Sequence, residues 1–375
     1  MDVTAVMWFV LGLALLIVGA EMLVRGASSI ASAIGISPLV AGLTIVAFAT
    51  SSPELAVSVQ ASFSGQPDVA LGNVVGSNIL NVLCVLGLSA LIRPLVVSRQ
   101  LVRLDVPLMV CASFLMLILA LDGNISRLDG VLLFAGLVAH NIWTVHQSRK
   151  ENSGRQKEYA DDLSSARNRS WRTVAINVTL VVVGLVVLVV GSDWLVNGAV
   201  AVAKTLGVSE LVIGLTIISV GTSLPELATS VVASLRGERD IAVGNVIGSN
   251  TFNILSVLGL SSIAAPRGLD VSPVALRFDI PIMIAVAVIC LPIFFRGYVI
   301  SRWEGALLLA YYATYVLYLV LDATQHDLLP AFATIVLSLV VPVTLLLLLV
   351  LVAWHVRGER RAATVGARPD SEEAG

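Results

Sequence analysis

The stretch GLTIVAFATSSPELAVSVQASFSGQPDVALGNVVGSNILN at residues 42–81 occurs again as GLTIISVGTSLPELATSVVASLRGERDIAVGNVIGSNTFN at residues 214–253. The offset is a constant 172 residues, and 24 of the 40 aligned positions are identical. Both copies are strongly apolar, yet each contains Thr-Ser-x-Pro-Glu followed by Gly-Asn-Val-x-Gly-Ser-Asn. A carboxylate inside an apolar helix costs about 3 kcal/mol at the centre of a bilayer. Glu54 and Glu226 are therefore expected to have a function.

The composition is that of a polytopic membrane protein. Of the 375 residues, 57% are hydrophobic and 13% are charged, whereas a soluble domain is about 25% charged. We therefore predict an all-α fold in a lipid bilayer, with no nucleic-acid partner and no disulfide framework. A membrane-spanning helix needs about 20 apolar residues, and eleven segments qualify: 3–24, 38–63, 69–92, 106–121, 128–146, 174–196, 210–235, 241–265, 280–295, 303–321 and 329–356.

The repeat extends beyond the two core stretches. RLDVP at 103–107 matches RFDIP at 277–281, and ISRLDG at 125–130 matches ISRWEG at 300–305. Five helices thus repeat as five helices, and because five is odd, the two copies must cross the membrane in opposite directions. This arrangement is the inverted-topology repeat of secondary transporters, whose sites lie near the midplane between the repeats. The predicted units are a first repeat at 1–146, a linker at 147–173, an inverted repeat at 174–322, and an extra helix with a tail at 323–375.

The basic residues predict the orientation. If the N-terminus lies outside, 19 of the 23 Lys and Arg residues fall on the inner side, as expected for cytoplasmic loops. We therefore predict an integral protein of the cell (inner) membrane with its N-terminus outside and its C-terminus in the cytoplasm. The linker is polar and of mixed charge, which favours a solvated segment.

The two core stretches offer oxygen ligands beside a helix break. Pro53 cannot donate a backbone hydrogen bond and interrupts the helix, and carbonyls freed at membrane depth need protein, water or an ion as a partner. Carboxylate, hydroxyl, amide and carbonyl oxygens are hard donors that suit Ca²⁺ and Na⁺. The candidates in the first copy are Thr50, Ser51, Glu54, Ser77 and Asn81, and those in the second are Thr222, Ser223, Glu226, Ser249 and Asn253.

Several of these residue types have structural explanations as well. Ser and Thr in membrane helices often hydrogen-bond to the carbonyl four residues earlier. We interpret the Gly-x-x-x-Gly pairs at 72–76 and 244–248 as close-packing positions. Asn73, Asn78, Asn245 and Asn250 could be ion ligands or could hydrogen-bond between helices, and we favour the second interpretation. Glu21 and Asp193 are expected at helix ends, where they would cap a helix or gate access.

At these residues the sequence resembles the sodium/calcium exchanger family, within the cation/Ca²⁺ antiporter superfamily. The two stretches resemble the paired alpha-repeats of that family, and the resemblance covers about residues 5–322. It implies a ten-helix core with one additional C-terminal helix. It also implies Ca²⁺ extrusion driven by Na⁺ entry, with alternating access through movement of the first and sixth helices. Ca²⁺ and Na⁺ would then be the transported ions, no cofactor would be needed, and a monomer would suffice for transport.

The same resemblance implies a set of metal ligands. They are Ala47 and Ser219 through their backbone carbonyls, and Thr50, Ser51, Glu54, Ser77, Asn81, Thr222, Ser223, Glu226, Ser249 and Asn253 through their side chains. Some family members have Asp where this chain has Asn253, so that the site here has two carboxylates instead of three. The Na⁺ stoichiometry and a K⁺ requirement therefore remain open.

Three other functions compete with Na⁺/Ca²⁺ exchange: Ca²⁺/H⁺ exchange, a cation channel and an enzyme. Ca²⁺/H⁺ antiporters of the same superfamily carry an extra Glu in place of the Gly-Ser-Asn part of the motif, which this chain retains at 76–78 and 248–250. A cation channel would need a continuous wet pore, whereas two opposed half-sites at one depth fit a carrier better. An enzyme is disfavoured, because the sequence has no His-Glu-x-x-His, no Ser/Lys or Ser/His pair and no phosphate-binding loop.

Overall fold

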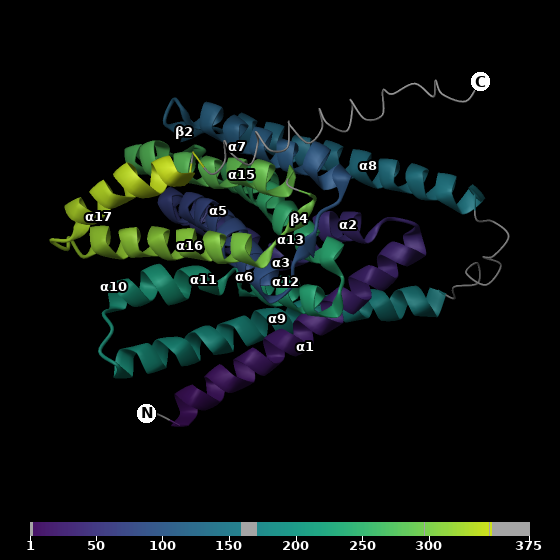
Figure 1. Ribbon diagram of the computed structural model, residues 1–375, viewed down its shortest axis with the longest axis horizontal. Helices are drawn as coiled ribbons and strands as arrows, with labels where there is room; N and C mark the ends of the chain where they lie inside the picture. Colours follow the sequence, from purple (N-terminus) through teal and green to yellow (C-terminus); the bar gives the residue numbers. More distant parts are fainter. Residues whose placement is uncertain (1–2, 159–170, 296, 345, 347–375) are drawn as a thin grey trace, which may run out of the picture.

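The structure, a computed structural model, describes residues 3–158, 171–295, 297–344 and 346 and is built almost entirely of helices (Figure 1). In the first half the elements are α1 (Val3–Ile34), α2 (Pro38–Ala41), η1 (Gly42–Val46), α3 (Ala47–Thr50), α4 (Ser52–Phe63), α5 (Pro67–Leu80), η2 (Asn81–Leu86), α6 (Gly87–Ile92), β1 (Leu95–Val96), η3 (Leu101–Asp105), α7 (Val106–Ala120), β2 (Asn124–Ile125) and α8 (Arg127–Glu158).

The second half follows the same order of elements. It contains α9 (Trp171–Thr205), α10 (Glu210–Ile213), η4 (Gly214–Ile218), α11 (Ser219–Gly221), α12 (Leu224–Arg236), α13 (Arg239–Phe252), η5 (Asn253–Leu258), α14 (Gly259–Ala264), β3 (Leu269–Asp270), η6 (Ala275–Asp279), α15 (Ile280–Phe295), β4 (Val299–Ile300) and α16 (Arg302–Ala323), and then α17 (Leu329–Ile335) and η7 (Val336–Val340). The elements labelled η are single π-helical turns inside longer helices.

Within the described residues, eight helices are long and apolar enough to cross a membrane, or nine if the bent pair Pro38–Thr50 and Ser52–Phe63 forms one span. The predicted seventh span, 210–235, is present as a broken helix, α10 to α12. The predicted eleventh span is described as the shorter apolar helix Leu329–Thr344, and most of the remainder of 329–356 lies outside the described residues. The structure therefore supports an all-α membrane fold without confirming the count of eleven.

Three predicted helix ends, those of α1, α8 and α9, were wrong by many residues. The spans predicted at 3–24 and 174–196 are longer helices, α1 and α9, which are followed by the left-handed glycines Gly35 and Gly207. The apolar run stops earlier than the helix because the polar residues that follow can continue a helix. As a result Glu21 and Asp193 lie inside long helices, and their expected place at helix ends was wrong. Helices α8 and α9 also extend into the predicted linker, leaving 159–170 outside the described residues.

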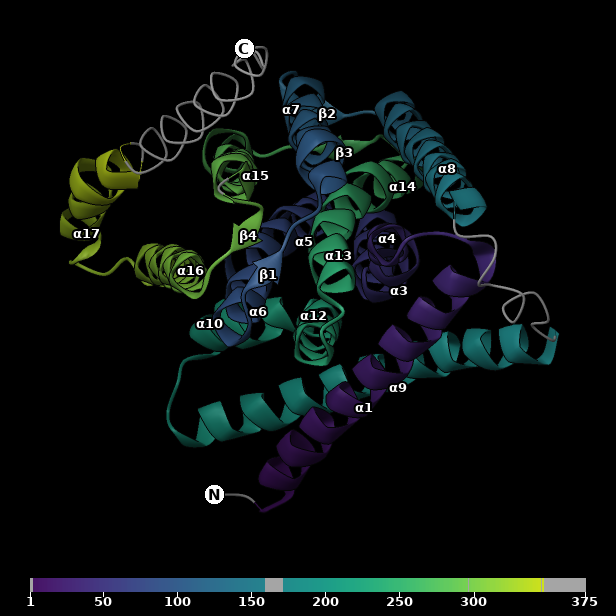
Figure 2. The same ribbon diagram turned by 45° about the vertical axis from the view of Figure 1, so that its right-hand side comes forward.

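Helices α1 and α9 pack against each other at one edge of the molecule, where α1 also contacts α12 (Figure 2). Glycines spaced seven residues apart line both helices at the contact. A Cβ on Gly19 would lie 2.8 Å from the carbonyl oxygen of Gly184, so the two backbones meet where only glycine fits. Toward one end, the rings of Trp8 and Trp194 meet edge to face at 4.6 Å. The two helices therefore form one closely packed unit.

Two short antiparallel strand pairs join the two halves. Strand β1 pairs with β4, with Leu95 opposite Ile300, and β2 pairs with β3, with Ile125 opposite Leu269. In the repeat β1 corresponds to β3 and β2 to β4, so the same pairing occurs twice. This duplication is what a pseudo-two-fold axis between inverted halves produces.

The helices that carry the repeated motif occupy the centre of the molecule. The apolar window of the helix formed by α13, η5 and α14 is buried throughout, and that of α5, η2 and α6 is mostly buried. Helices α4 and α12 pack beside α5 and α13, while α7, α8, α15 and α16 lie around them (Figure 2). The motif residues are thus held in the interior.

Candidate metal-ion site

The site is built around two broken helices. Helix α3 ends at Thr50 and α4 begins at Ser52, with a bend of 46° between the two segments, and in the second half α11 ends at Gly221 and α12 begins at Leu224. The break predicted near Pro53 is therefore confirmed. Each proline lies in the first turn of the following helix, where its missing N–H removes no helical hydrogen bond. Glu54 and Glu226 lie in those same first turns, where the helix dipole favours negative charge.

The two glutamates are held by hydrogen bonds that cross between the halves. Ser223 Oγ donates to Glu54 Oε1 at 2.9 Å, and Ser51 Oγ donates to Glu226 Oε1 at 3.0 Å. Both glutamates have 0% of their surface exposed. Within the described part of the chain, neither Oε2 atom has a hydrogen-bond partner. A buried polar atom without a partner is costly, and a cation bound between the two carboxylates would satisfy both.

No basic side chain neutralises this pair: among the described residues, no ion pair joins Glu54 or Glu226 to Lys or Arg. No group of three or more His, Cys, Asp or Glu residues that could hold a metal ion occurs in the described ranges. The remaining ligands of a cation at this site would therefore be neutral oxygens, which agrees with the hard-donor set expected from the sequence.

Helices α5 and α13 supply amides and hydroxyls to the same region. Asn253 Nδ2 donates to Ser77 Oγ at 2.9 Å and to Asn78 Oδ1 at 3.1 Å, while its Oδ1 has no partner among the described residues. Both amide atoms of Asn81 likewise lack a partner there. Asn81 and Asn253 are the first residues of the π-helical turns η2 and η5, a type of irregularity that often marks functional positions.

A second set of hydrogen bonds supports the broken helices. Asn73 Nδ2 donates to the carbonyl oxygen of Glu54 at 3.1 Å and to Ser58 Oγ at 2.9 Å. In the other half, Asn245 Nδ2 donates to the carbonyl oxygen of Glu226 at 3.4 Å and to Ser230 Oγ at 3.0 Å. These contacts agree with the interpretation of the asparagines as donors between helices.

The Asn78 and Asn250 amides follow the same pattern, because each donates to the backbone carbonyl of the other, at 3.4 and 3.3 Å. Ser58 and Ser230 were not among the residues predicted from the sequence. Both could have been identified from the sequence, because they are polar residues in an apolar stretch and are identical in the two copies.

The two half-sites differ in exposure. Ten of the twelve candidate residues are buried, but Thr222 is half-buried and Ser219 is exposed. Ser219 Oγ donates to the carbonyl oxygen of Thr216 within its own helix. Thr50, the counterpart of Thr222 in the first half, is fully buried and donates to Asn245 Oδ1 at 3.1 Å.

Glycine packing accounts for this difference. A Cβ on Gly248 would lie 2.6 Å from the carbonyl oxygen of Leu43, so α13 packs closely on η1 and α3. At the corresponding Gly72 and Gly76 of α5, a Cβ would meet no atom within 4 Å among the described residues. The close-packing interpretation thus holds for the second glycine pair and is wrong for the first in this structure. The site is shielded on the side of α2 and α3 and is more open on the side of α10 and α11.

The sequence matches the family model of the sodium/calcium exchanger proteins in two stretches, residues 4–143 and 176–321. The putative antiporter CaxA of Alkalimonas amylolytica is 39% identical over 83% of this chain and 97% of its own length. The inner membrane protein YrbG of Escherichia coli is 37% identical over 75% of this chain and 85% of its own length.

A solved structure has the same fold. The sodium-calcium exchanger NCX_Mj, soaked with zero Na⁺ and Ca²⁺, superposes with a TM-score of 0.72 at 31% sequence identity, over 85% of this chain and all of that one.

Proposed function

The chain belongs to the sodium/calcium exchanger family, and on this premise we propose that it carries Ca²⁺ across the membrane in exchange for Na⁺. The observation that carries the proposal is the buried pair Glu54 and Glu226, one from each repeat, with an unpartnered oxygen on each among the described residues. One Ca²⁺ cancels the two negative charges, and so do two Na⁺. Competition of the two ions for the same pair of carboxylates is the physical basis of exchange.

We propose that the twelve residues named from the sequence form the ion site. Ca²⁺ takes six to eight oxygen ligands, more than the two carboxylates provide, so hydroxyl, amide and backbone oxygens must complete the shell. The exposure of Ser219 and the half-burial of Thr222 support a conformation in which the second half-site is not yet closed. Thr222 already donates to Asn73 Oδ1 of α5 at 3.3 Å, and closure of α10 and α11 onto α5 would bring the Ser219 carbonyl toward the glutamates.

Transport assays with one imposed gradient at a time distinguish Na⁺/Ca²⁺ exchange from Ca²⁺/H⁺ exchange, K⁺-dependent exchange and a channel. We expect ⁴⁵Ca²⁺ uptake into proteoliposomes loaded with Na⁺, and no uptake driven by a K⁺ or pH gradient alone. Uptake driven by the pH gradient would instead indicate Ca²⁺/H⁺ exchange, and a requirement for K⁺ beside Na⁺ would indicate a K⁺-dependent exchanger. Unitary currents would indicate a channel.

We further propose that the protein lies in the cell (inner) membrane with the N-terminus outside and the C-terminus in the cytoplasm. The 19-to-4 division of Lys and Arg supports this orientation, as does the similarity to a relative named as an inner membrane protein. A monomer contains both half-sites and would suffice for transport, without a cofactor and without enzymatic chemistry.

The orientation can be tested with reporters. A reporter in the 147–173 linker and one at the C-terminus are expected to be cytoplasmic, whereas one at the N-terminus is expected outside. Reporter activity and labelling by an impermeant reagent measure the side directly. A linker and a C-terminus on opposite sides would contradict the eleven-span count or the inversion of the repeat.

A further inference from the structure

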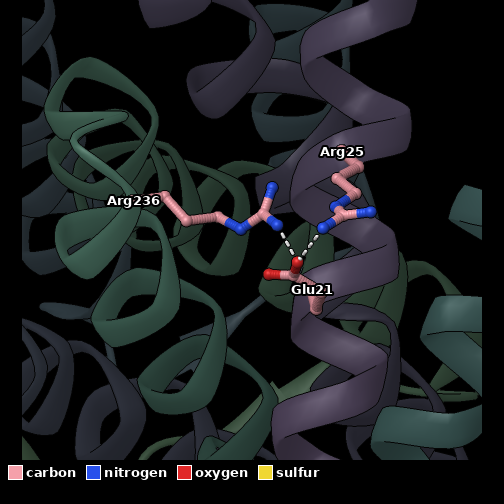
Figure 3. A network of polar contacts seen from close by, with 3 residues as sticks. All are labelled: Glu21, Arg25 and Arg236. Atoms are coloured by element: carbon pink, nitrogen blue, oxygen red, sulfur yellow. Dashed lines mark ion pairs between the residues drawn. The ribbon is translucent and has the colours of Figure 1, made fainter.

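Three charged side chains join α1 to α12 (Figure 3). Glu21 Oε1 lies 2.6 Å from Nη2 of Arg25, one turn further along α1. The same oxygen also contacts Nη2 of Arg236, the last residue of α12. The Glu21 and Arg236 side chains are 31% and 30% exposed, so the pair between the helices is partly shielded from its surroundings.

The repeat has no equivalent of this ion pair on the opposite side. The offset of 172 residues places Asp193 at the position of Glu21, Asn197 at that of Arg25 and Ser64 at that of Arg236. Asn197 Nδ2 donates to Asp193 Oδ2 at 3.2 Å, within α9 itself. Ser64 is exposed and carries no charge that could bind Asp193. Among the described residues, the charged connection between a long helix and a broken helix therefore occurs between α1 and α12 and not between α9 and α4.

The ion pair lies on the side where the site is shielded. Helix α1 packs along α12 and also contacts α2 and η1, the segment whose close packing on α13 covers the first half-site. The start of α2 is further tied to α8, since Ser148 Oγ accepts a hydrogen bond from Ser37 N at 2.9 Å. Helices α1 and α8 run toward the 147–173 linker, so this is the linker side of the protein.

Inverted repeats change the accessible side by exchanging the packing of their two halves. When the linker side opens, α1 must leave its contact with α12, and the Glu21–Arg236 pair must break. On the other side, α9 would approach α4, where Ser64 offers no cation to Asp193. The change to the conformation open on the linker side therefore breaks the Glu21–Arg236 ion pair, and no ion pair forms at Asp193 on the opposite side to replace it.

We propose that Glu21 and Arg236 form a one-sided latch that favours the conformation closed on the linker side and so makes the apparent Ca²⁺ affinity differ between the two membrane faces. These are positioning residues, since neither touches the ion site. The inference rests on the proposed function, because it needs a carrier that alternates between two faces. An apparent affinity equals the intrinsic affinity multiplied by the fraction of protein in the competent conformation. Breaking the latch therefore changes the ratio of the affinities at the two faces.

The test is to measure the half-saturating Ca²⁺ concentration at each face in right-side-out and inside-out vesicles. For Glu21→Gln or Arg236→Gln we expect the linker-side affinity to rise relative to the opposite face by about two- to fivefold, the range that a partly exposed ion pair supports. The double variant should show the same shift as either single variant, because the pair is already broken in each. Arg25→Gln, which removes only the pair within α1, is the matched control and should leave the ratio near that of the wild type.

Ser64→Arg gives the reciprocal test, since it places a cation on α4 at the position that corresponds to Arg236. We expect this variant to shift the ratio in the same direction as the latch-breaking variants, because it adds an ion pair with Asp193 to the opposite conformation. Its position is exposed, so it tests the latch even if the Glu21 variants fold poorly. An unchanged ratio in the Glu21 and Arg236 variants, or a Ser64→Arg shift in the opposite direction, would overturn the latch. Absence of Na⁺-driven uptake by the wild type would instead overturn the proposed function.

Discussion

Replacing either Glu54 or Glu226 with Gln is expected to abolish Ca²⁺ transport while the protein still folds and inserts. Each substitution removes one of the two negative charges at a buried site, so a bound Ca²⁺ would leave an uncompensated positive charge there. Ligand charge sets Ca²⁺ affinity over several orders of magnitude, and we expect a loss of at least about 100-fold in affinity. Flux of ⁴⁵Ca²⁺ into Na⁺-loaded proteoliposomes measures the effect.

The crossed hydrogen bonds predict that the two substitutions are equivalent. The side-chain oxygen of a Gln at 54 can still accept the hydrogen bond from Ser223, and that of a Gln at 226 the one from Ser51. Each variant therefore loses one charge and keeps its hydrogen bond to the other half. Asp68→Asn, on the exposed first turn of α5, is the matched control and should transport normally. Near-normal flux through either folded Gln variant would remove that glutamate from the ion site.

The second large effect is expected at Gly248, where α13 packs on η1 and α3. In Gly248→Ala the added methyl would lie 2.6 Å from the carbonyl oxygen of Leu43 and 2.9 Å from Cβ of Ala47. Because the first of these contacts is backbone, a helix must shift. Overpacking of this kind costs about 1–3 kcal/mol, and the shift would carry the neighbouring Ser249 away from Thr50. We therefore expect both a lower thermal stability and a loss of transport.

Gly76→Ala is the matched variant, because Gly76 occupies the same place in the first repeat and an added methyl there meets nothing within 4 Å among the described residues. We expect it to unfold at the wild-type temperature. If α10 and α11 close onto α5 during transport, its turnover should nevertheless fall. Thermal unfolding and flux, measured on the same preparations, separate the two effects. Equal destabilisation by the two alanines would contradict the asymmetric packing.

The sequence was sufficient to predict the helix break and the burial of the glutamates. Both follow from local chemistry, because a proline is favoured at the start of a helix and disfavoured in its interior, and Glu54 and Glu226 are flanked by apolar residues on both sides. The contact between the two halves was also predictable, since corresponding segments of an inverted repeat meet near its pseudo-two-fold axis. The crossing of Ser51 to Glu226 and of Ser223 to Glu54 is a consequence of that symmetry.

The helix ends and the difference between the halves could not be predicted in the same way. Helix α1 continues for ten residues beyond the predicted end at residue 24, because a helix is limited by its backbone hydrogen bonds and its final glycine, and the apolar run reports only the part that faces lipid. The unequal exposure of Thr50 and Thr222 has no signal in the Thr-Ser-x-Pro-Glu motif, which both copies share. In the structure it goes with the close packing of α13 on η1 and α3, which α5 does not repeat on α10 and α11. If the protein alternates between two conformations, as we propose, one sequence must encode both packings.

The π-helical turns also bear on the history of the chain. Three of them occur at matching places in both halves: Gly42–Val46 with Gly214–Ile218, Asn81–Leu86 with Asn253–Leu258, and Leu101–Asp105 with Ala275–Asp279. A π turn accommodates one residue more than a regular α-helical turn, so each matching pair corresponds to the same inserted residue in both copies. The simplest history places all three insertions in a single five-helix ancestor, before the gene was duplicated. That ancestor would have inserted in both orientations and assembled as an antiparallel dimer, with one glutamate contributed by each chain.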